Sequence, residues 1–235
     1  MEQNKTRTYL LYAVGEIALV MIGILLALQV NNWNEGRLVE EEINAIVLNL
    51  NSEFKDNLEQ LNNDLLRIDA VLNGLEELLD LTHEKSYNIN QQEFNELLET
   101  TFTTPTWSPS SVVVEELKYS GGFSRLNDET LKRLLFDWER HFLDQQGVLV
   151  GYNTYAAEYI EYLSINGSVR TLDAISGLVP GLKPSSIAEN NLSMLKDPLF
   201  ENRVDNFYFL AYKLRDSYRE SAVKLKAIIE HTGGN

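Results

Sequence analysis

Histidines and carboxylates are the side chains of this chain that could carry out acid–base or metal chemistry, and their spacing argues against both. His83, His141 and His231 lie far apart, and none belongs to a Glu-x-x-His or His-Glu-x-x-His motif. The chain has no G-x-S-x-G or P-loop motif and 0 cysteines, which excludes thiol catalysis, disulfides and cysteine-bound metals. We therefore expect no catalytic residue, no metal and no cofactor, and we interpret the protein as not being an enzyme.

Glu16 is the most informative single residue, because it is the one ionisable side chain between Thr8 and Val30. A carboxylate near the middle of a membrane costs about 3 kcal/mol. On a helix, Glu16 shares a face with residues that follow it at steps of three and four, and the small residues among them allow a second helix to approach closely. This face predicts a membrane-helix interface formed by Tyr12, Glu16, Val20, Gly23 and Ala27. We expect the same face to continue into the apolar seam that begins at Val39.

Glu16 is either a residue that is merely tolerated in the helix or a residue with one of two roles. In the first, a neutral Glu16 hydrogen-bonds within a helix oligomer, with the Tyr12 hydroxyl one turn earlier as a local partner. In the second, Glu16 is a proton-linked or partner-coupling site of a membrane subunit. The apolar segment contains no basic residue, so a charge partner for Glu16 would come from another chain.

Tyrosines are concentrated on two segments with helical spacing. One segment carries Tyr152, Tyr155, Tyr159 and Tyr162, and the other carries Tyr208, Tyr212 and Tyr218. They are either the edge of a core, with hydroxyls that reach water, or the lining of a groove for a small ligand or peptide. The groove would be formed by Tyr152, Tyr155, Tyr159, Tyr208 and Tyr212.

The element that positions Glu16 is long enough to cross a membrane. The 23 residues from Thr8 to Val30 would span roughly 34 Å as a helix, against a hydrocarbon core of about 30 Å. Tyr9, Tyr12 and Trp33 lie where aromatic belts form. A cleaved signal peptide would have a shorter apolar region followed by a small-x-small site, so we favour a retained anchor.

The flanking charges predict the orientation of this helix. Lys5 and Arg7 precede it, whereas Arg37 stands among several glutamates after it. The positive-inside rule then gives a short cytoplasmic tail at residues 1–7, a transmembrane helix at residues 8–30 and an outer domain at residues 31–235.

The outer domain has the pattern of amphipathic helices. The first has an apolar seam at steps of three and four: Val39, Ile43, Ile46, Leu50, Phe54, Leu58, Leu61, Leu65, Ile68, Leu72, Leu75 and Leu79. The first proline is Pro105, so this helix is expected to continue the membrane helix as one rod. We predict an all-α fold, in which one transmembrane helix runs into an antiparallel helical bundle of three long and two or three short helices.

Local signals predict where the other elements begin and end. Asn127 and Asp197 are the expected N-caps of the second and third long helices, and Ser108, before a proline, is the expected start of a short one. Residues 83–90 are expected to form a turn, and a short helix is expected at 187–195. Residues 168–186 are expected to be the longest irregular stretch and a mobile or partner-facing loop.

Two stretches resemble a known family. The run YLLYAVGEIALVMIGILLALQVNNWNE, from Tyr9 to Glu35, closely resembles the N-terminus of an uncharacterised family of single-span membrane proteins, a domain of unknown function from Bacteroidetes-type bacteria. The stretch from Val112 to Phe142 is similar to that family's EELK-S-G--S-I-D--LR--L--YY segment. The resemblance implies an anchor in the bacterial inner membrane and a helical domain in the periplasm. It implies no activity and no catalytic residue.

Charge and composition limit the partners. The net charge is −15, and the charges of the first 30 residues cancel, so the acidity belongs to the outer domain. Such a domain repels phosphates, which argues against nucleic acid and against an anionic lipid surface as a docking site. We expect a membrane-anchored periplasmic interaction or scaffold protein that self-associates through the transmembrane helix and the first long helix. Its partners would be the lipid bilayer, a second copy and other membrane or periplasmic proteins.

One alternative function belongs to a different class. A periplasmic helical bundle that binds a ligand could act as a sensor and signal through a separate membrane partner.

Overall fold

The structure is a computed structural model, and it describes residues 2–83, 88–187 and 190–234. Within these ranges it contains helices and no strand, which confirms the all-α fold class. The elements are α1 (Glu2–His83), α2 (Gln91–Thr100), α3 (Val112–Tyr119), α4 (Gly122–Arg125), α5 (Glu129–Asn166), α6 (Val169–Ser176), the 3₁₀ helix η1 (Asn191–Lys196) and α7 (Pro198–Gly233).

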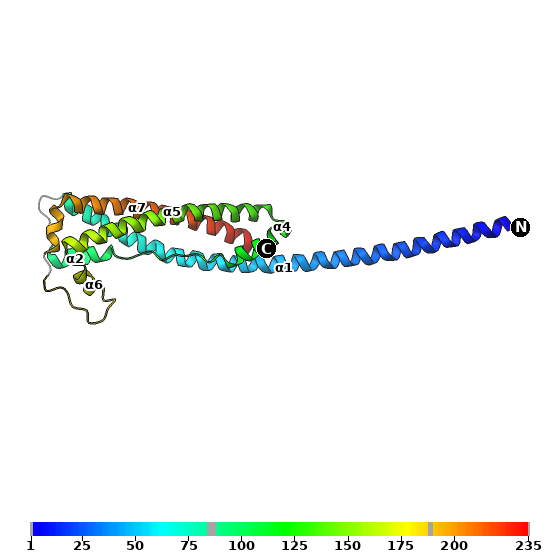
Figure 1. The fold of residues 1–235 in the computed structure, drawn as a ribbon, viewed down its shortest axis with the longest axis horizontal. Coiled ribbons are helices and arrows are strands. Elements are labelled where there is room, and N and C mark those ends of the chain that lie inside the picture. Colours follow the sequence, from blue (N-terminus) through cyan, green and yellow to red (C-terminus); the bar gives the residue numbers. More distant parts are fainter. Residues whose placement is uncertain (1, 84–87, 188–189, 235) are drawn as a thin grey trace.

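The apolar N-terminal segment and the first soluble helix form one helix. α1 is continuous over 82 residues, so the expected rod is confirmed, and residues 31–36 do not interrupt it. Figure 1 shows the first part of α1 projecting far beyond the other helices, which gather along its second part. At about 1.5 Å per residue, the whole helix is roughly 120 Å long.

α7 packs along α1 in the opposite direction. The Asn51 side chain donates a 2.8 Å hydrogen bond to the carbonyl oxygen of Ile229. Further along α1, Asp69 lies 3.7 Å from Arg215. Residue numbers therefore rise on one helix as they fall on the other, and the C-terminal end of α7 lies beside the part of α1 where the bundle begins.

α5 packs on another side of α7, again in the opposite direction. His141 contacts Ser221, and Glu158 forms an ion pair with Arg203. α7 is thus the long helix that packs against both of the others, α1 and α5.

The seam of α1 faces these helices, and most of its predicted members are buried. Val39 and Leu79, at the two ends of the seam, are half-buried, and so are Leu58 and Leu65, where the preceding residues, Asn57 and Asp64, occupy the core positions. The buried members of the predicted seam are Ile43, Ile46, Leu50, Phe54, Leu61, Ile68, Leu72 and Leu75.

Asn57 and Asp64 bind an extended segment between α2 and α3, which we call the strap (residues 103–111). The Asp64 carboxylate accepts hydrogen bonds from the backbone N–H groups of Thr106 and Trp107. The Asn57 amide exchanges two 2.8 Å hydrogen bonds with the backbone of Ser110. Because an extended segment cannot satisfy its own backbone groups, these side chains of α1 do so for it.

The start of α3 is also held by α1. Glu53 accepts hydrogen bonds from the N–H groups of Val112 and Val113, the first residues of α3. The prediction that Ser108 caps this helix is therefore wrong, because the helix begins three residues later than predicted and a carboxylate from another helix supplies the cap.

The starts of the two later long helices agree in part with prediction. Asp197 caps α7 by accepting a hydrogen bond from the Leu199 N–H, as predicted. α5 is capped by Asp128, which accepts from the Leu131 N–H, so the predicted cap Asn127 is wrong by one residue. Aspartate and asparagine are both good caps, and the sequence pattern does not separate neighbouring candidates.

The prediction that residues 168–186 are irregular is wrong for their first half. That half forms α6, which Ser168 caps. The remaining part, residues 177–187, projects from the end of the bundle farthest from the N-terminus (Figure 1). It exposes Leu178, Val179 and Ile187. We call this segment the distal loop.

Two predictions fall partly on residues outside the described ranges. The short helix expected at 187–195 is the 3₁₀ helix η1, which begins at Asn191, and residues 188–189 are outside the described part. The turn expected at 83–90 begins where α1 ends and finishes at Asn90, the cap of α2. Its residues 84–87 are outside the described part.

Asp64→Asn tests whether the strap depends on this carboxylate. Both backbone N–H groups donate to one carboxylate oxygen of Asp64, and the other oxygen accepts from Arg67. Asparagine has a single oxygen and must turn its NH2 group toward either the strap or the Arg67 guanidinium, so we expect the free energy of unfolding of the full chain to fall by about 1–3 kcal/mol. The measurement is urea denaturation in detergent, followed by circular dichroism. Asp56→Asn, at an exposed position of α1, is the control and should change it by less than about 0.5 kcal/mol. An equal effect of both substitutions would contradict the role given to Asp64.

Candidate functional site

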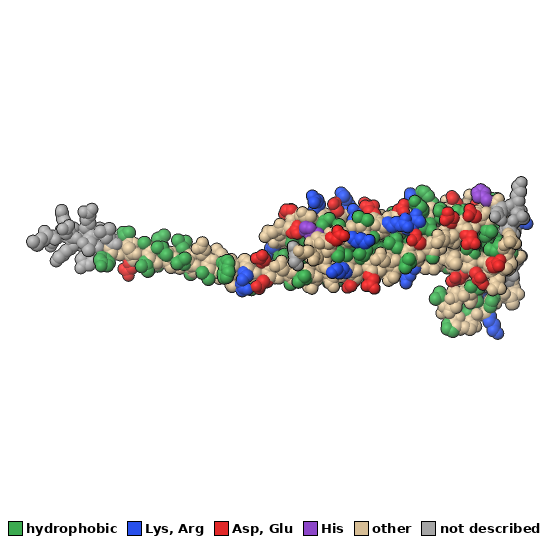
Figure 2. Space-filling view, turned by 180° about the vertical axis from the view of Figure 1, so that it is seen from behind, with side chains coloured by type: hydrophobic (Ala, Val, Ile, Leu, Met, Phe, Trp, Pro, Cys, Tyr) green, Lys and Arg blue, Asp and Glu red, His purple; other side chains and the backbone are tan. Residues whose placement is uncertain are grey.

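The N-terminal part of α1 exposes a long apolar surface. Every residue from Tyr12 to Val30 is exposed, and most are large apolar residues. In Figure 2 this stretch leaves the bundle as a bare rod with many apolar side chains. Exposed apolar surface of this extent marks a membrane or protein contact, and the segment is long and apolar enough to cross a membrane. α1 therefore contains a candidate membrane span, which fits a membrane anchor.

The five residues of the predicted membrane-helix interface lie on one side of this span. Tyr12, Glu16, Val20, Gly23 and Ala27 follow one another at steps of four and three on a continuous helix, and all are exposed. A Cβ atom added to Gly23 would meet no atom of the chain within 4 Å. The fold of the chain itself therefore gives no steric reason for a glycine there, although glycine costs about 1 kcal/mol relative to alanine inside a helix.

The predicted tyrosine groove includes residues that belong to the core. Tyr152 and Tyr159 are buried, and their rings lie 5.2 Å and 5.5 Å from the ring of Phe207 on α7. Burial raises the pKa of both hydroxyls, because the charged form would be poorly solvated, so both stay protonated. These two side chains fill the space between α5 and α7 instead of lining an opening.

The other three tyrosines of that prediction are more accessible. Tyr155 and Tyr208 are half-buried. Tyr212 is exposed, and the guanidinium of Arg215 lies 4.3 Å from the centre of its ring, a cation–π contact on the surface.

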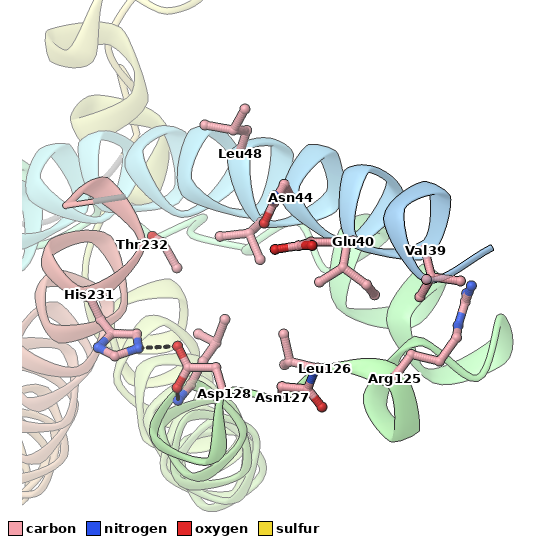
Figure 3. A pocket seen from close by; sticks show the side chains of 14 residues that line it. Val39, Glu40, Asn44, Leu48, Arg125, Leu126, Asn127, Asp128, His231 and Thr232 are labelled. Carbon is pink, nitrogen blue, oxygen red and sulfur yellow. Dashed lines mark hydrogen bonds and ion pairs between the residues drawn. The ribbon is translucent and has the colours of Figure 1, made fainter. Parts of the chain in front are cut away.

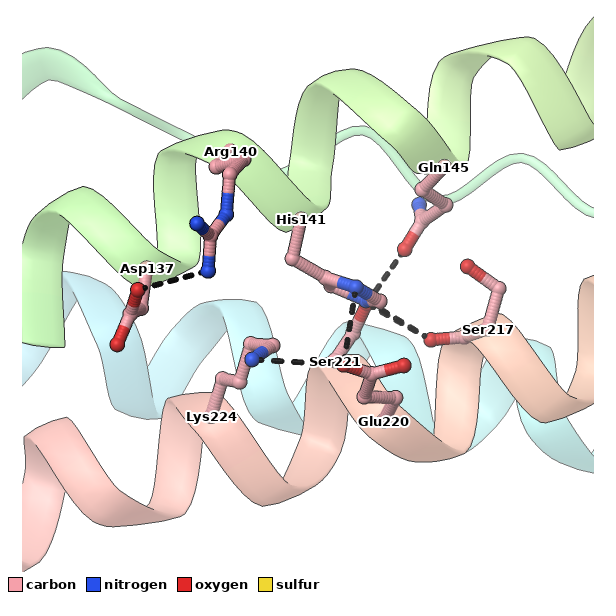
Figure 4. Close-up of polar contacts among 8 residues, drawn as sticks. All are labelled: Asp137, Arg140, His141, Gln145, Ser217, Glu220, Ser221 and Lys224. Carbon is pink, nitrogen blue, oxygen red and sulfur yellow. Dashed lines mark hydrogen bonds and ion pairs between the residues drawn. The ribbon is translucent and has the colours of Figure 1, made fainter.

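A polar cluster between α5 and α7 has the residue types of a nucleophilic triad (Figure 4). His141 Nε2 lies 2.9 Å from Ser221 Oγ and 3.2 Å from the Ser217 carbonyl oxygen. His141 Nδ1 lies 3.4 Å from a carboxylate oxygen of Glu220. The histidine thus contacts a serine through one ring nitrogen and a glutamate through the other, as in the catalytic triads of hydrolases.

The details of this cluster do not suit nucleophilic attack. Ser221 is fully buried, and its hydroxyl donates to the side-chain oxygen of Gln145. A carbonyl oxygen only accepts, so the Ser217 contact places a proton on His141 Nε2. That nitrogen therefore cannot take a proton from Ser221. We interpret the cluster as a set of hydrogen bonds that joins two long helices.

A cavity of about 560 Å³ lies at the end of the bundle nearer the span, between α1, the start of α5 and the end of α7 (Figure 3). Val39, Glu40 and Asn44 line it from α1. On the opposite side, His231 Nε2 lies 2.6 Å from the carboxylate of Asp128. The apolar and polar groups are mixed, so the lining suits water better than a dry apolar ligand.

The Asp128 carboxylate, which lines this cavity, is held by hydrogen bonds from two sides. Burial alone would raise its pKa, but hydrogen bonds from the Leu131 N–H and from His231 outweigh burial and hold the pKa below its ordinary value. Asp128 therefore joins two helices, because it caps α5 and binds the end of α7, and it also lines the cavity beside them.

Sequence reasoning missed the pairs that join distant elements. Asp128 and His231 are 103 positions apart, and His141 and Ser221 are 80 apart, so no local pattern indicates either contact. Asn57 and Asp64 had a usable signal, because they stand one heptad apart beside predicted core leucines. Among the residues that the structure describes, no three histidine, aspartate or glutamate side chains gather as a metal site would require.

A family model matches the first part of the chain. Residues 16–143, more than half of the 235 residues, match the model described as Family of unknown function (DUF6090). The match runs from Glu16 through the rest of α1, the strap and the first part of α5. No curated protein and no solved structure matches the chain.

Asp128→Asn tests the electrostatic role of this residue. A carboxylate whose pKa is lower in the folded than in the unfolded chain stabilises the fold above the unfolded value, near pH 4, and that contribution is lost as the pH falls through the folded value. We expect the melting temperature of the variant to fall less than that of the wild type between pH 5 and pH 3, measured by circular dichroism. Asp144→Asn, at an exposed position of the same helix, should keep the wild-type acid dependence. Identical acid profiles of all three proteins would contradict this.

Proposed function

Because the chain belongs to DUF6090, a family of unknown function, its role has to be argued from its own surfaces, and we propose that it is a non-catalytic, membrane-anchored scaffold protein. In this proposal residues 8–30 cross the bacterial inner membrane once, with residues 1–7 in the cytoplasm and residues 31–235 in the periplasm. Two copies associate through the span and α1, and the paired bundles bind other membrane or periplasmic proteins.

The observation that carries the proposal is the face of α1 that includes Glu16 and Gly23. Within the described residues this face makes no contact with the bundle, and a side chain at Gly23 would be tolerated sterically. A carboxyl group in the hydrocarbon region is costly unless another group hydrogen-bonds it, and helices pack closely where small residues are present. A second copy of the same helix supplies both the hydrogen-bond partner and the close contact.

The charge of the outer domain supports a role away from the lipid surface. A domain that carries the whole net charge of −15 is repelled by anionic head groups, so it stands above the membrane on the continuous helix α1. A rod of this kind holds its bundle at a fixed distance from the bilayer, which suits a scaffold that positions partners.

Gly23→Leu and Gly15→Leu form a matched pair that tests self-association through the span. Both glycines lie in the span with free space around them, but Gly15 faces about 100° away from the Glu16 face. We expect Gly23→Leu to weaken the dimer of the full chain about 5-fold to 30-fold, as the loss of a close helix contact worth about 1–2 kcal/mol would. Gly15→Leu should leave the dimer unchanged. The measurement is sedimentation equilibrium in detergent.

Two outcomes of that measurement would overturn self-association through the span. One is a wild type that stays monomeric at every usable concentration. The other is an equal effect of the two leucine substitutions, since leucine at either position adds the same apolar volume.

The orientation can be tested with single-cysteine variants, because the natural chain contains no cysteine. Leu178→Cys is in the distal loop, where the side chain is 85% exposed, and Lys5→Cys is in the tail. We expect a membrane-impermeant maleimide to label Leu178→Cys in cells whose outer membrane has been permeabilised, and to label Lys5→Cys only after the inner membrane is also opened. The reverse pattern would contradict the proposed topology.

A further inference from the structure

The continuity of α1 fixes how its span is rotated relative to its bundle. Each residue of a helix turns by about 100°, so faces can be compared along the whole length. The centre of the Glu16 face and the centre of the buried seam from Ile43 to Leu61 lie about 160° apart on this count. The expectation that the Glu16 face continues into the seam that begins at Val39 is therefore wrong. The seam is on nearly the opposite side of the helix, where it is buried by the rest of the bundle.

The Glu16 face continues instead along the outer side of α1. Beyond Val30 it meets residues at steps of three and four that all remain exposed in the structure. Leu38 is 50% exposed and Leu48, which also borders the cavity of Figure 3, is 64% exposed, although both are large and apolar. Above the span, this outer stripe consists of Asn34, Leu38, Glu41, Ala45, Leu48 and Ser52.

We propose that the outer stripe of α1 is the docking surface for a second copy of this chain, with the two α1 helices parallel and in register from Glu16 to Ser52. This inference rests on the proposed self-association of the span and extends it about 33 Å beyond the membrane, over the 22 residues from Asn31 to Ser52.

Membrane anchoring is the reason why the partner is a second copy in parallel. Two copies inserted in the same orientation have their spans parallel, so a symmetric pair has its axis along the helices and each residue of the stripe meets its own counterpart. Once Glu16 of one copy faces Glu16 of the other, the continuous helices carry Leu38 and Leu48 toward their counterparts as well. Asn34 then faces Asn34, and one buried asparagine in a parallel coiled coil favours two strands in register.

The charges near the stripe permit this pairing. Glu41 is the one carboxylate of the stripe above the membrane, and Arg37 donates a 2.6 Å hydrogen bond to it within the chain. In a parallel pair, Arg37 of each copy also lies beside Glu41 of the other, so the charged layer contains cations and anions in equal number. The layers of Ala45 and Ser52 are small enough for the helices to come close.

The bundles do not obstruct the pair. Because the buried seam lies nearly opposite the stripe, each bundle projects away from the partner when the two α1 helices are side by side. An exposed face of α5 could compete with the outer stripe as the contact between two copies. Its Leu143 is 66% exposed, almost the same as Leu48. These two leucines therefore make a matched pair for a test.

Disulfide cross-linking in native membranes tests the inference on the full chain. The single-cysteine variants are Ala27→Cys in the span, Leu48→Cys on the outer stripe and Leu143→Cys on α5. Two cysteines join only when their Cα atoms are about 4.4–6.8 Å apart, so a cross-link reports a close symmetric contact. We expect mild oxidation to convert Ala27→Cys and Leu48→Cys to reducible dimers and to leave Leu143→Cys monomeric.

The other outcomes separate this inference from the proposed function. Cross-linking of Ala27→Cys without Leu48→Cys would overturn the inference and leave self-association of the span intact. If neither Ala27→Cys nor Leu48→Cys cross-links, both the inference and the proposed self-association of the span are overturned. Cross-linking of Leu143→Cys to the same extent as Leu48→Cys, or in its place, would also overturn the inference, because it would indicate random collision or an interface on α5.

A second pair of variants measures the strength of the contact. Leu48→Lys places a charge in the proposed interface, whereas Leu143→Lys places the same charge at an equally exposed position of α5. We expect Leu48→Lys to raise the dimer dissociation constant in detergent at least tenfold and Leu143→Lys to leave it unchanged. Equal dissociation constants for the two variants would contradict the proposal that the outer stripe is the dimer contact. Both side chains are exposed, so neither substitution changes the core.

Discussion

The structure depends on one constraint, which is that α1 does not break. A helix without a hinge cannot change the angle between its two ends, so the direction in which the span presents Glu16 also decides where the bundle lies. The bundle buries one side of α1 from Ile43 onward, and the opposite side stays exposed from the candidate span to Ser52. Anchoring, folding and the proposed pairing therefore use different faces of a single element.

The strap is the second feature that organises the bundle. Pro105 and Pro109 prevent residues 103–111 from continuing as a helix, and their backbone groups need partners from elsewhere. Asn57 and Asp64 provide them, which explains two polar residues in an otherwise apolar seam. The strap in turn places Trp107 in the core, where it packs on three other aromatic rings: those of Trp138, Phe142 and Tyr218.

The features that sequence reasoning predicted are those set by neighbouring residues. The span, the continuous α1 and the Asp197 cap follow from local apolarity and capping chemistry. The Ser108 cap was wrong because Glu53, from another helix, takes its place. The pairing of Asp128 with His231 depends on the packing of α7 against α5, which no local pattern contains. The outer stripe is different, since counting turns along α1 is possible from the sequence once the helix is known to be unbroken.

The distal loop acquires a distinct property from its place at the end of the rod. α1 rises about 80 Å between Val30 and His83, and the loop with Leu178 and Val179 projects from that far end. Under the proposed anchoring, every copy in one membrane would carry these apolar side chains at about the same height above the bilayer. Encounters between the loop and a neighbouring anchored molecule take place within a thin layer parallel to the bilayer, so crowding in two dimensions, and not concentration in the surrounding volume, sets their frequency.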